Sequence, residues 1–342
     1  MKAGTKRILR KFRTINTERM EKTVEVIMKT SGRSKAYIYC DMALNFLKYH
    51  MGYTDYYRGN FIDRTDAEKR TYATAASFYN VIHYFNKQEY SGIFNNKLVF
   101  CKYFNDYLGR QWLNLNISTA DDLAEFMKKH PVIFAKDPFG EGGHGIRRIV
   151  SDEIPDIDAL YRELCAGGQL LVEEGIVQCK ELNEVNPYVV NSFRVLTIVK
   201  DGKAYLLNNS LRMNQDAESV IGCSNDLYCT FDSEGRIAGN VVDDFGNIYT
   251  EHPLTGKKFD ELRLPNINEA FDLCLRAAME VPDMRYIGWD IAFSENGPLI
   301  VEGNDYPGYG LFQYYLINGK RTGHLEEIRQ IVGDEMERIK PV

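Results

Sequence analysis

The residues with the clearest chemical potential lie near the end of the chain, in a predicted hairpin. Asp290 lies in the apolar run 286–294, and Glu302 and Asn304 lie in the run 299–304. Alternate residues of a strand share a face, so Glu302 and Asn304 point the same way, and a short turn brings Asp290 beside them. Two carboxylates and an amide oxygen this close together are unfavourable without a cation. Hard oxygen ligands in apolar surroundings indicate a magnesium site, and an edge hairpin with solvated acids is the alternative.

A glycine-rich segment follows a lysine in the middle of the chain. Lys136 lies at the end of the predicted strand PVIFAKDP, and four glycines precede the returning strand IRRIVS. Glycines between two strands leave backbone N–H groups free to wrap an anion, and a neighbouring lysine can neutralise phosphate oxygens. The pattern is neither a Walker motif nor the dinucleotide fingerprint, and a flexible surface hairpin would look similar. The four glycines are Gly140, Gly142, Gly143 and Gly145.

A third segment is the predicted strand 169–174, which leads into Gly175, Ile176 and Val177. The end of such a strand exposes backbone N–H and C=O groups between apolar residues, and these groups can bind the edge of an adenine. An ordinary core strand looks the same. The segment therefore indicates nucleotide binding only in combination with the glycine loop and the acidic hairpin.

The order of these segments resembles the ATP-grasp superfamily: a strand lysine with a glycine flap, a VEE hinge, an Asn-x-x-Arg strand, and Asp followed by Glu-x-Asn. The closer likeness is to the sugar-transfer-associated ATP-grasp family found with polysaccharide-assembly proteins, and it covers about residues 90–325. The matching stretches are 176–199, 252–259 and 284–308, of which the last is the most specific. The chain departs from the family at Cys179, where histidine is common, and at 221–229, toward the acceptor side.

The resemblance implies two α+β subdomains with antiparallel sheets that clamp ATP and magnesium, and commonly an acyl phosphate attacked by an amine. By this likeness, Lys97 and Lys136 would hold the phosphates while the loop 140–145 closes over them. Arg194 would stabilise charge on the moving phosphoryl group, with Lys136 as a second catalytic residue; a surface arginine is the alternative. The implied nucleotide-binding residues are Lys97, Lys136, Gly140, Gly142, Gly143, Gly145, Glu173, Glu174, Ile176 and Val177, and the magnesium ligands are Asp290, Glu302 and Asn304.

The rest of the sequence indicates an α+β architecture. The chain has 342 residues, 44% hydrophobic and 26% charged, and lacks an apolar run long enough for a transmembrane helix. Seven scattered cysteines without a CxxC pair predict a reduced, cytoplasmic protein. We expect a helical N-terminal region (1–90), a small ATP-grasp subdomain with the flap (91–180) and a C-terminal subdomain with the metal site (181–342). Helices are expected at 36–51, 73–86, 97–108, 156–166, 268–280 and 322–340, and strand pairs at 192–200 with 203–212 and within 227–242.

Charge is distributed unevenly along the chain. Residues 1–35 hold eleven Lys or Arg against three Glu, a net +8, which leaves −14 for the remainder. The acidic body argues against nonspecific nucleic-acid binding. Within residues 6–15, apolar side chains share one helical face and the other positions are mostly basic. Such a helix can lie on an anionic membrane or can dock on its own domain. The apolar residues are Ile8, Leu9, Phe12 and Ile15.

These features favour a carboxylate–amine ligase that uses ATP and magnesium. Its partners would be small-molecule or sugar-linked acids and amines in surface polysaccharide biosynthesis. A phosphotransferase with a hydroxyl acceptor and a nucleotide-binding protein without turnover are the alternatives, and the intact set of metal ligands disfavours the second. A ligase releases phosphate only when both an acid and an amine are present, whereas a kinase leaves the phosphate on one acceptor.

Overall fold

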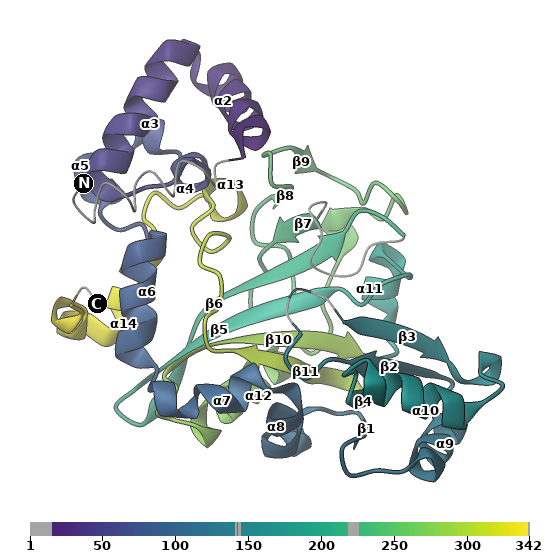
Figure 1. Cartoon of the computed structure of the whole chain (residues 1–342). Helices are drawn as coiled ribbons and strands as arrows, with labels where there is room; N and C mark the ends of the chain where they lie inside the picture. The colour runs from purple at the N-terminus through teal and green to yellow at the C-terminus, as the bar shows by residue number, and fades with distance from the viewer. Residues whose placement is uncertain (1–15, 141, 143–144, 218–225, 341–342) are drawn as a thin grey trace.

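The structure is a computed structural model that describes residues 16–140, 142, 145–217 and 226–340. It has the expected α+β architecture, with an N-terminal helical region beside two antiparallel sheets (Figure 1). None of the described helices is long and apolar enough to cross a membrane. The α-helices are α2 (Thr17–Ser31), α3 (Lys35–Tyr49), α4 (Tyr53–Arg58), α5 (Asp66–Lys69), α6 (Ala75–Phe85), α7 (Ser91–Asn95), α8 (Lys97–Tyr103), α9 (Ala120–Lys129), α10 (Ile157–Ala166), α11 (Lys180–Val185), α12 (Ile267–Glu280), α13 (Tyr315–Asn318) and α14 (His324–Val332).

The strands form a small sheet of four and a large sheet of seven, and every pairing is antiparallel. The small sheet has the order β1-β4-β2-β3 and the large sheet the order β11-β10-β5-β6-β7-β8-β9. The strands are β1 (Trp112–Asn114), β2 (Val132–Lys136), β3 (Ile146–Val150), β4 (Leu171–Glu174), β5 (Ser192–Lys200), β6 (Lys203–Asn214), β7 (Asp226–Cys229), β8 (Val241–Val242), β9 (Ile248–Tyr249), β10 (Tyr286–Ser294) and β11 (Gly297–Asn304).

Local signals explain the ends of the N-terminal helices. α2 begins after Asn16, whose side chain accepts a hydrogen bond from the Arg19 N–H, and it ends at Gly32 in the left-handed region (φ 68°). Ser34 caps α3 in the same way. The C-terminal tail departs from the expected single helix over 322–340. α14 stops before Gly333 (φ 60°), and Gly333–Arg338 form a 3₁₀ helix, because a glycine in the left-handed region ends the α-helical hydrogen-bond ladder.

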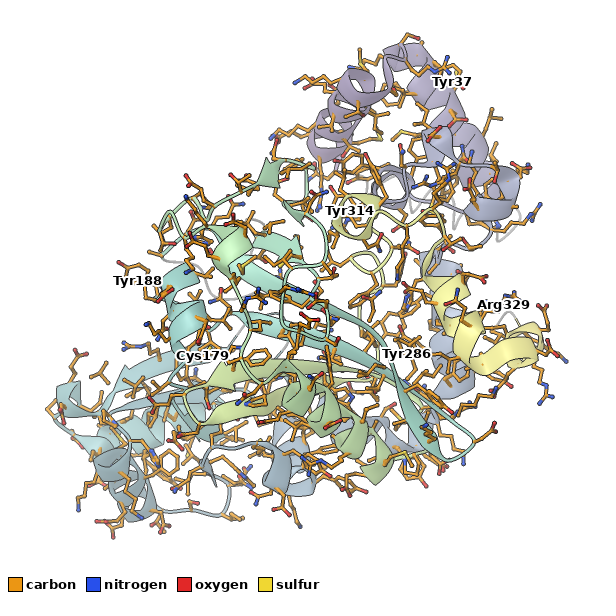
Figure 2. All side chains as sticks on the ribbon, turned by 180° about the vertical axis from the view of Figure 1, so that it is seen from behind. Tyr37, Cys179, Tyr188, Tyr286, Tyr314 and Arg329 are labelled. Atoms are coloured by element: carbon orange, nitrogen blue, oxygen red, sulfur yellow. The ribbon has the colours of Figure 1, made fainter. Side chains whose placement is uncertain are left out.

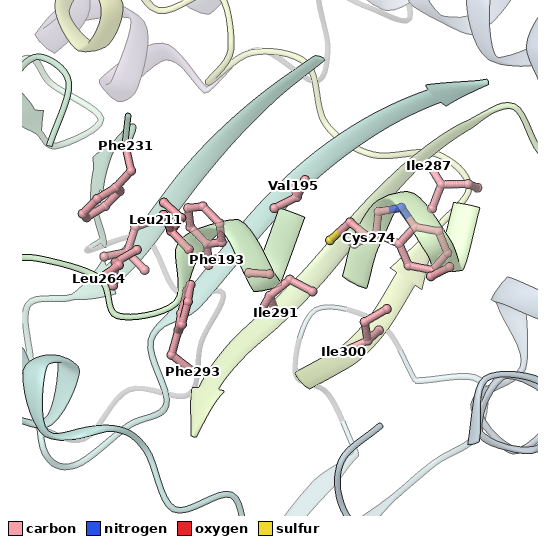
Figure 3. Packing of buried hydrophobic residues seen from close by; sticks show 14 of the residues in the cluster. Phe193, Val195, Leu211, Phe231, Leu264, Cys274, Ile287, Ile291, Phe293 and Ile300 are labelled. Atoms are coloured by element: carbon pink, nitrogen blue, oxygen red, sulfur yellow. The ribbon is translucent and has the colours of Figure 1, made fainter. Parts of the chain in front are cut away.

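The large sheet is buried on one face and on part of the other. β5 and β6 form the expected hairpin around Asp201 and Gly202, both with positive φ as a tight hairpin turn requires. One face packs against α12 through side chains such as Phe193 and Ile291 (Figure 3). Part of the other face packs against α6 and α14 through Leu196 and neighbouring residues. The remainder of that second face carries the polar residues of the candidate site.

One buried side chain fastens the end of α6 to the large sheet. The Asn86 carboxamide oxygen accepts the N–H of Tyr286 at 2.8 Å, and its amide nitrogen donates to the carbonyls of Tyr286 and Asp305, each at 2.8 Å. Asn86 is 2% exposed, so these backbone groups have little access to water. The Asn86 side chain thus completes the backbone hydrogen bonding at the start of β10, beyond the end of its pairing with β11.

Asn86→Ala should lower the free energy of unfolding by about 3 kcal/mol, because it leaves several buried backbone groups unpaired at roughly 1–3 kcal/mol each. Urea unfolding followed by circular dichroism measures the change. Gln88→Ala, at an exposed position two residues away, is the control and should alter stability by less than about 0.5 kcal/mol. Equal stabilities for the two variants would contradict this role of Asn86.

Candidate nucleotide and metal site

Strand register brings three of the predicted site residues into one row across the large sheet. Asp290 in β10 lies directly opposite Glu302 in β11 on one side and opposite Arg194 in β5 on the other. Arg194 in turn lies opposite Ser210 in β6. Residues directly opposite each other in antiparallel strands project from the same face. Asn304 lies two residues beyond Glu302, and its amide nitrogen donates to Asp290 Oδ2 at 3.3 Å.

Arg194 forms a two-pronged ion pair with Asp290. Its Nε and Nη2 donate to the two carboxylate oxygens, the second at 2.8 Å. Burial alone would lower the pKa of Arg194, but the charge of Asp290 more than offsets this, so the pKa is raised and the guanidinium stays charged. Asp290 is 9% exposed. Both of its oxygens already have a cationic partner, which leaves Glu302 and Asn304 as the more available ligands of the predicted metal site.

The cations around Glu302 do not fully offset its burial and the charge of Asp290. Burial and the neighbouring charge of Asp290 raise its pKa, and Lys97 and Arg194 offset the effect only in part. The closest of these cations is Lys97, whose Nζ lies 3.6 Å from a Glu302 oxygen. The Glu302 side chain is 36% exposed, so solvent weakens the repulsion without removing it. A divalent cation next to Glu302 would supply the missing charge, and this fits the predicted magnesium site.

The predicted magnesium ligands are two acids and one amide. Among the described residues, no group of three or more His, Cys, Asp or Glu side chains is arranged to hold a metal ion. Oxygen donors of this mixed kind suit a hard cation that keeps some coordination positions for phosphate oxygens.

Lys97 and the base of the glycine loop lie at the Glu302 end of this row. Asn96 caps α8 by accepting from the Leu98 N–H at 3.0 Å, which starts the helix with Lys97 as its first residue. The Lys97 Nζ donates to the Gly140 carbonyl at 2.6 Å and thus lies between the loop and Glu302. Gly142 and Gly145 have positive φ, as expected for a glycine turn. Gly143 lies outside the described residues.

Lys136 and Glu173 are paired with each other in the small sheet. The two side chains form an ion pair, and Arg110 donates to the same carboxylate through Nε at 3.0 Å and through Nη2. Burial alone would raise the pKa of Glu173, but Arg110 and Lys136 together lower it to about 2. The Glu173 carboxylate therefore lies inside the protein, between two cations, rather than at an open surface.

The segment predicted to bind adenine continues past the end of β4 and leaves the small sheet there. The Glu174 carboxylate accepts the Gln111 N–H at 3.0 Å, and the Gly175 N–H donates to Val132 at 2.9 Å. Ile176 is half-buried and Val177 is exposed. The Val177 carbonyl accepts the Glu295 N–H at 3.1 Å, which joins this segment to the turn of the β10–β11 hairpin. The segment thus bridges the two sheets.

Sequence reasoning missed Arg110, which connects the same two sheets. Its Nη1 donates to the Ile300 carbonyl at 2.7 Å and its Nη2 to the Val301 carbonyl at 3.0 Å, both in β11, while the same guanidinium holds Glu173 in β4. The only local signal is the preceding Gly109, which has φ 54° and whose added Cβ would lie 3.0 Å from Leu299. An arginine after a glycine is too common a pattern to predict this contact.

A hollow of about 480 Å³ opens elsewhere on the surface, beside α12 and the β5–β6 turn. Its lining includes Tyr107, whose hydroxyl donates to Glu280, and Arg276, which lies over the Tyr107 ring. It is shallow and contains none of the predicted site residues. We therefore place the candidate site at the row of Arg194, Asp290 and Glu302.

A family model described as sugar-transfer associated ATP-grasp matches residues 82–329. The chain belongs to this family. The family and the fold class expected from the sequence are thereby confirmed, with α2 to α5 lying before the matched region. No curated protein sequence matches the chain.

Solved structures with similar folds include several ligases and carboxylases. D-alanyl-alanine synthetase A from Vibrio cholerae is 13% identical, with a TM-score of 0.44, over 73% of this chain and 67% of that one. The ATP-grasp ligase PsnB, complexed with a precursor variant, Mg and ADP, is 15% identical, with a TM-score of 0.41, over 66% and 54%. Biotin carboxylase from Campylobacter jejuni is 11% identical, with a TM-score of 0.43, over 70% and 46%. The chain thus spans about half to two thirds of these proteins.

Glu302→Gln should stabilise the metal-free protein at neutral pH. Because the folded-state pKa of Glu302 is raised, the folded state holds this proton more tightly, and stability falls as pH rises above the ordinary value of 4.5. Glutamine carries no charge to lose. The difference in melting temperature, variant minus wild type, should therefore be near zero at pH 4 and positive at pH 7, measured by calorimetry with a chelator.

Glu295→Gln is the matched control, since Glu295 is exposed in the turn of the same hairpin. It should give no pH-dependent difference. A Glu302→Gln variant that becomes less stable than wild type as the pH rises would contradict the charge deficit at this position.

Proposed function

We propose that the protein is an ATP- and magnesium-dependent carboxylate–amine ligase. The observation that carries the proposal is the row of Arg194, Asp290 and Glu302, in which Lys97, 3.6 Å from Glu302, compensates that carboxylate only in part. A row of one basic and two acidic side chains next to a glycine loop suits the polyphosphate of a nucleotide with a divalent cation. Membership of the ATP-grasp family supports the choice of ATP.

Bound ATP would supply the phosphoryl group, and magnesium would supply the positive charge that Glu302 and Asn304 are placed to hold. Lys97 would exchange its bond with the Gly140 carbonyl for phosphate oxygens. The backbone of the glycine loop would cover the same group and exclude water. Lys136, which neutralises Glu173, would add to the positive potential on the small-sheet side.

Arg194 is the residue best placed to neutralise charge during transfer. Its guanidinium is held charged and aligned by Asp290, so little reorganisation is needed when negative charge develops nearby. Phosphoryl transfer requires little covalent chemistry from the protein, and positioning with charge neutralisation provides most of the rate. We therefore assign Arg194 to electrostatic stabilisation and not to proton transfer.

Activation of an acid as an acyl phosphate accounts for the need for ATP. The terminal P–O bond of ATP breaks as a carboxylate oxygen of the acid forms a new bond to phosphorus, which turns that oxygen into part of a leaving group. The amine then attacks the carbonyl carbon, phosphate leaves, and the nitrogen loses a proton. The family is described as sugar-transfer associated, and we propose an amino acid or a sugar acid for surface polysaccharide as the substrate.

A kinase with a hydroxyl acceptor is the second candidate function, and the ion pair of one arginine supports it. Arg212 lies on the same face as Ser210 and is the nearest candidate on that strand for binding an acidic acceptor. Its Nε donates to Asp226, and its guanidinium lies 5.9 Å from the centre of the Tyr228 ring. An arginine already paired with a carboxylate offers less to an acid substrate, and a hydroxyl acceptor has no need of it.

Hydroxylamine distinguishes the two reactions, since it traps an acyl phosphate as a hydroxamate. With ATP, magnesium and a pool of uronic and amino acids, the ligase should form a hydroxamate and release phosphate, whereas a kinase should form a stable phosphate ester. Glu302→Gln should lower either turnover by at least about 100-fold, because charge on the phosphoryl group is no longer balanced. Glu295→Gln should keep the wild-type rate, and near-normal magnesium-dependent turnover by Glu302→Gln would refute the site.

A further inference from the structure

The outward face of α3 is apolar along its whole length. Six exposed residues recur at helical spacing, and none carries a charge or an amide. Tyr37 is 47% exposed, Leu44 63% and Leu47 70%. Tyr37 projects from the outer margin of the N-terminal region, away from both sheets (Figure 2). The face consists of Ala36, Tyr37, Cys40, Ala43, Leu44 and Leu47, and we call it the α3 face.

The packing of α3 fixes this face outward. On the opposite side, Ile38 and Met42 are buried in a cluster with Val24 of α2 and Tyr56 of α4. The Tyr56 hydroxyl also donates to Asp41 on the flank of α3. Rotation of the helix to hide the α3 face would expose this core. A helix that is apolar on nearly all sides normally has a partner on each of them.

Basic side chains lie at the margins of the α3 face. Arg33 lies over the Tyr37 ring at 5.2 Å, and Lys35 and Lys48 lie at the two ends of the helix. Lys35 is 3.5 Å from Glu21, and Lys48 is paired with Asp66, so part of this charge is compensated locally. Over residues 1–50, twelve lysines and arginines outnumber four acids, a net +8 in a chain whose net charge is −6, and six of those positive charges belong to residues 1–15, outside the described part of the chain.

We propose that the α3 face docks on an anionic lipid surface. Apolar side chains with an aromatic residue and a basic surround match the boundary between acyl chains and negatively charged headgroups. A second copy of this chain is the less favourable occupant, because pairing two α3 faces joins two chains whose N-terminal sequences both carry net positive charge. The negative body of the protein would meanwhile be repelled from the same surface, which favours one orientation.

The segment before α2 supplies a second membrane signal. Residues 1–15 lie outside the described part of the chain, but they contain six lysines and arginines and no acid, and they join α2 at Asn16. α2, which follows this segment, packs in the same core cluster as α3. One weak apolar anchor gives only marginal binding, and a basic segment together with it gives stable but salt-sensitive attachment.

Flotation of the full-length protein with vesicles tests the proposal. Wild type should bind vesicles of 30% phosphatidylglycerol in phosphatidylcholine at low salt, and should bind pure phosphatidylcholine weakly. Leu44→Ser with Leu47→Ser should reduce the bound fraction about fivefold or more, because two exposed apolar side chains lose their contact with lipid. Ile117→Ser, at an 83% exposed position on the small-sheet lobe, is the control and should bind as wild type.

Melting temperatures equal to wild type should confirm that both variants fold, and hydroxamate formation without vesicles should be unchanged, which separates this proposal from the proposed reaction. Failure of wild type to bind anionic vesicles would overturn it, as would normal binding by the double variant. If a chain starting at Thr17 loses all binding while the double variant keeps it, the contact belongs to residues 1–15 alone. A dimer in light scattering that the double variant abolishes, without vesicle binding, would assign the α3 face to a second copy.

Discussion

One buried carboxylate couples the two sheets on which the candidate site is built. Burial raises the pKa of Glu173 in the small sheet, but Arg110 and Lys136 more than offset this and hold it at about 2. Because Arg110 also donates to two carbonyls of β11, the position of the small sheet is tied to the strand that carries Glu302 and Asn304. Loss of one cation from a buried group of this kind typically costs about 3–5 kcal/mol. The cost holds the two sheets in one relative position.

The large sheet supplies the second part of the arrangement, a row of charged side chains in which one acid is compensated only in part. Arg194 satisfies Asp290, and Lys97 satisfies Glu302 only partly. Glu173 is therefore a structural charge, already compensated by two cations. Glu302 is a charge that a ligand can still compensate. This contrast separates the carboxylate that holds the fold from the carboxylate that we assign to binding.

Sequence reasoning succeeded where the contact is local and failed where it is long-range. The closeness of Asp290 and Glu302 follows from strand alternation and one short turn, and the structure places them directly opposite each other. The pairing of Arg110 with Glu173 joins residues 63 positions apart in different elements, and no spacing rule predicts it.

Two other differences have particular physical causes. The sequence predicts one helix over 322–340, but the helix ends at Gly333, a glycine that is able to terminate it. The exposure of Leu44 and Leu47 could not be predicted, because an apolar position in a helix does not reveal which face finds a partner.

The most direct test of the proposed magnesium site is to locate the bound metal ion. Crystals grown with Mn²⁺ and a non-hydrolysable ATP analogue would reveal the ion by its anomalous scattering. The account predicts a manganese peak within about 2.0–2.6 Å of oxygens of Glu302 and Asn304, with phosphate oxygens on the ion and on Lys97. A peak elsewhere, or a nucleotide bound away from the row of Arg194, Asp290 and Glu302, would contradict it.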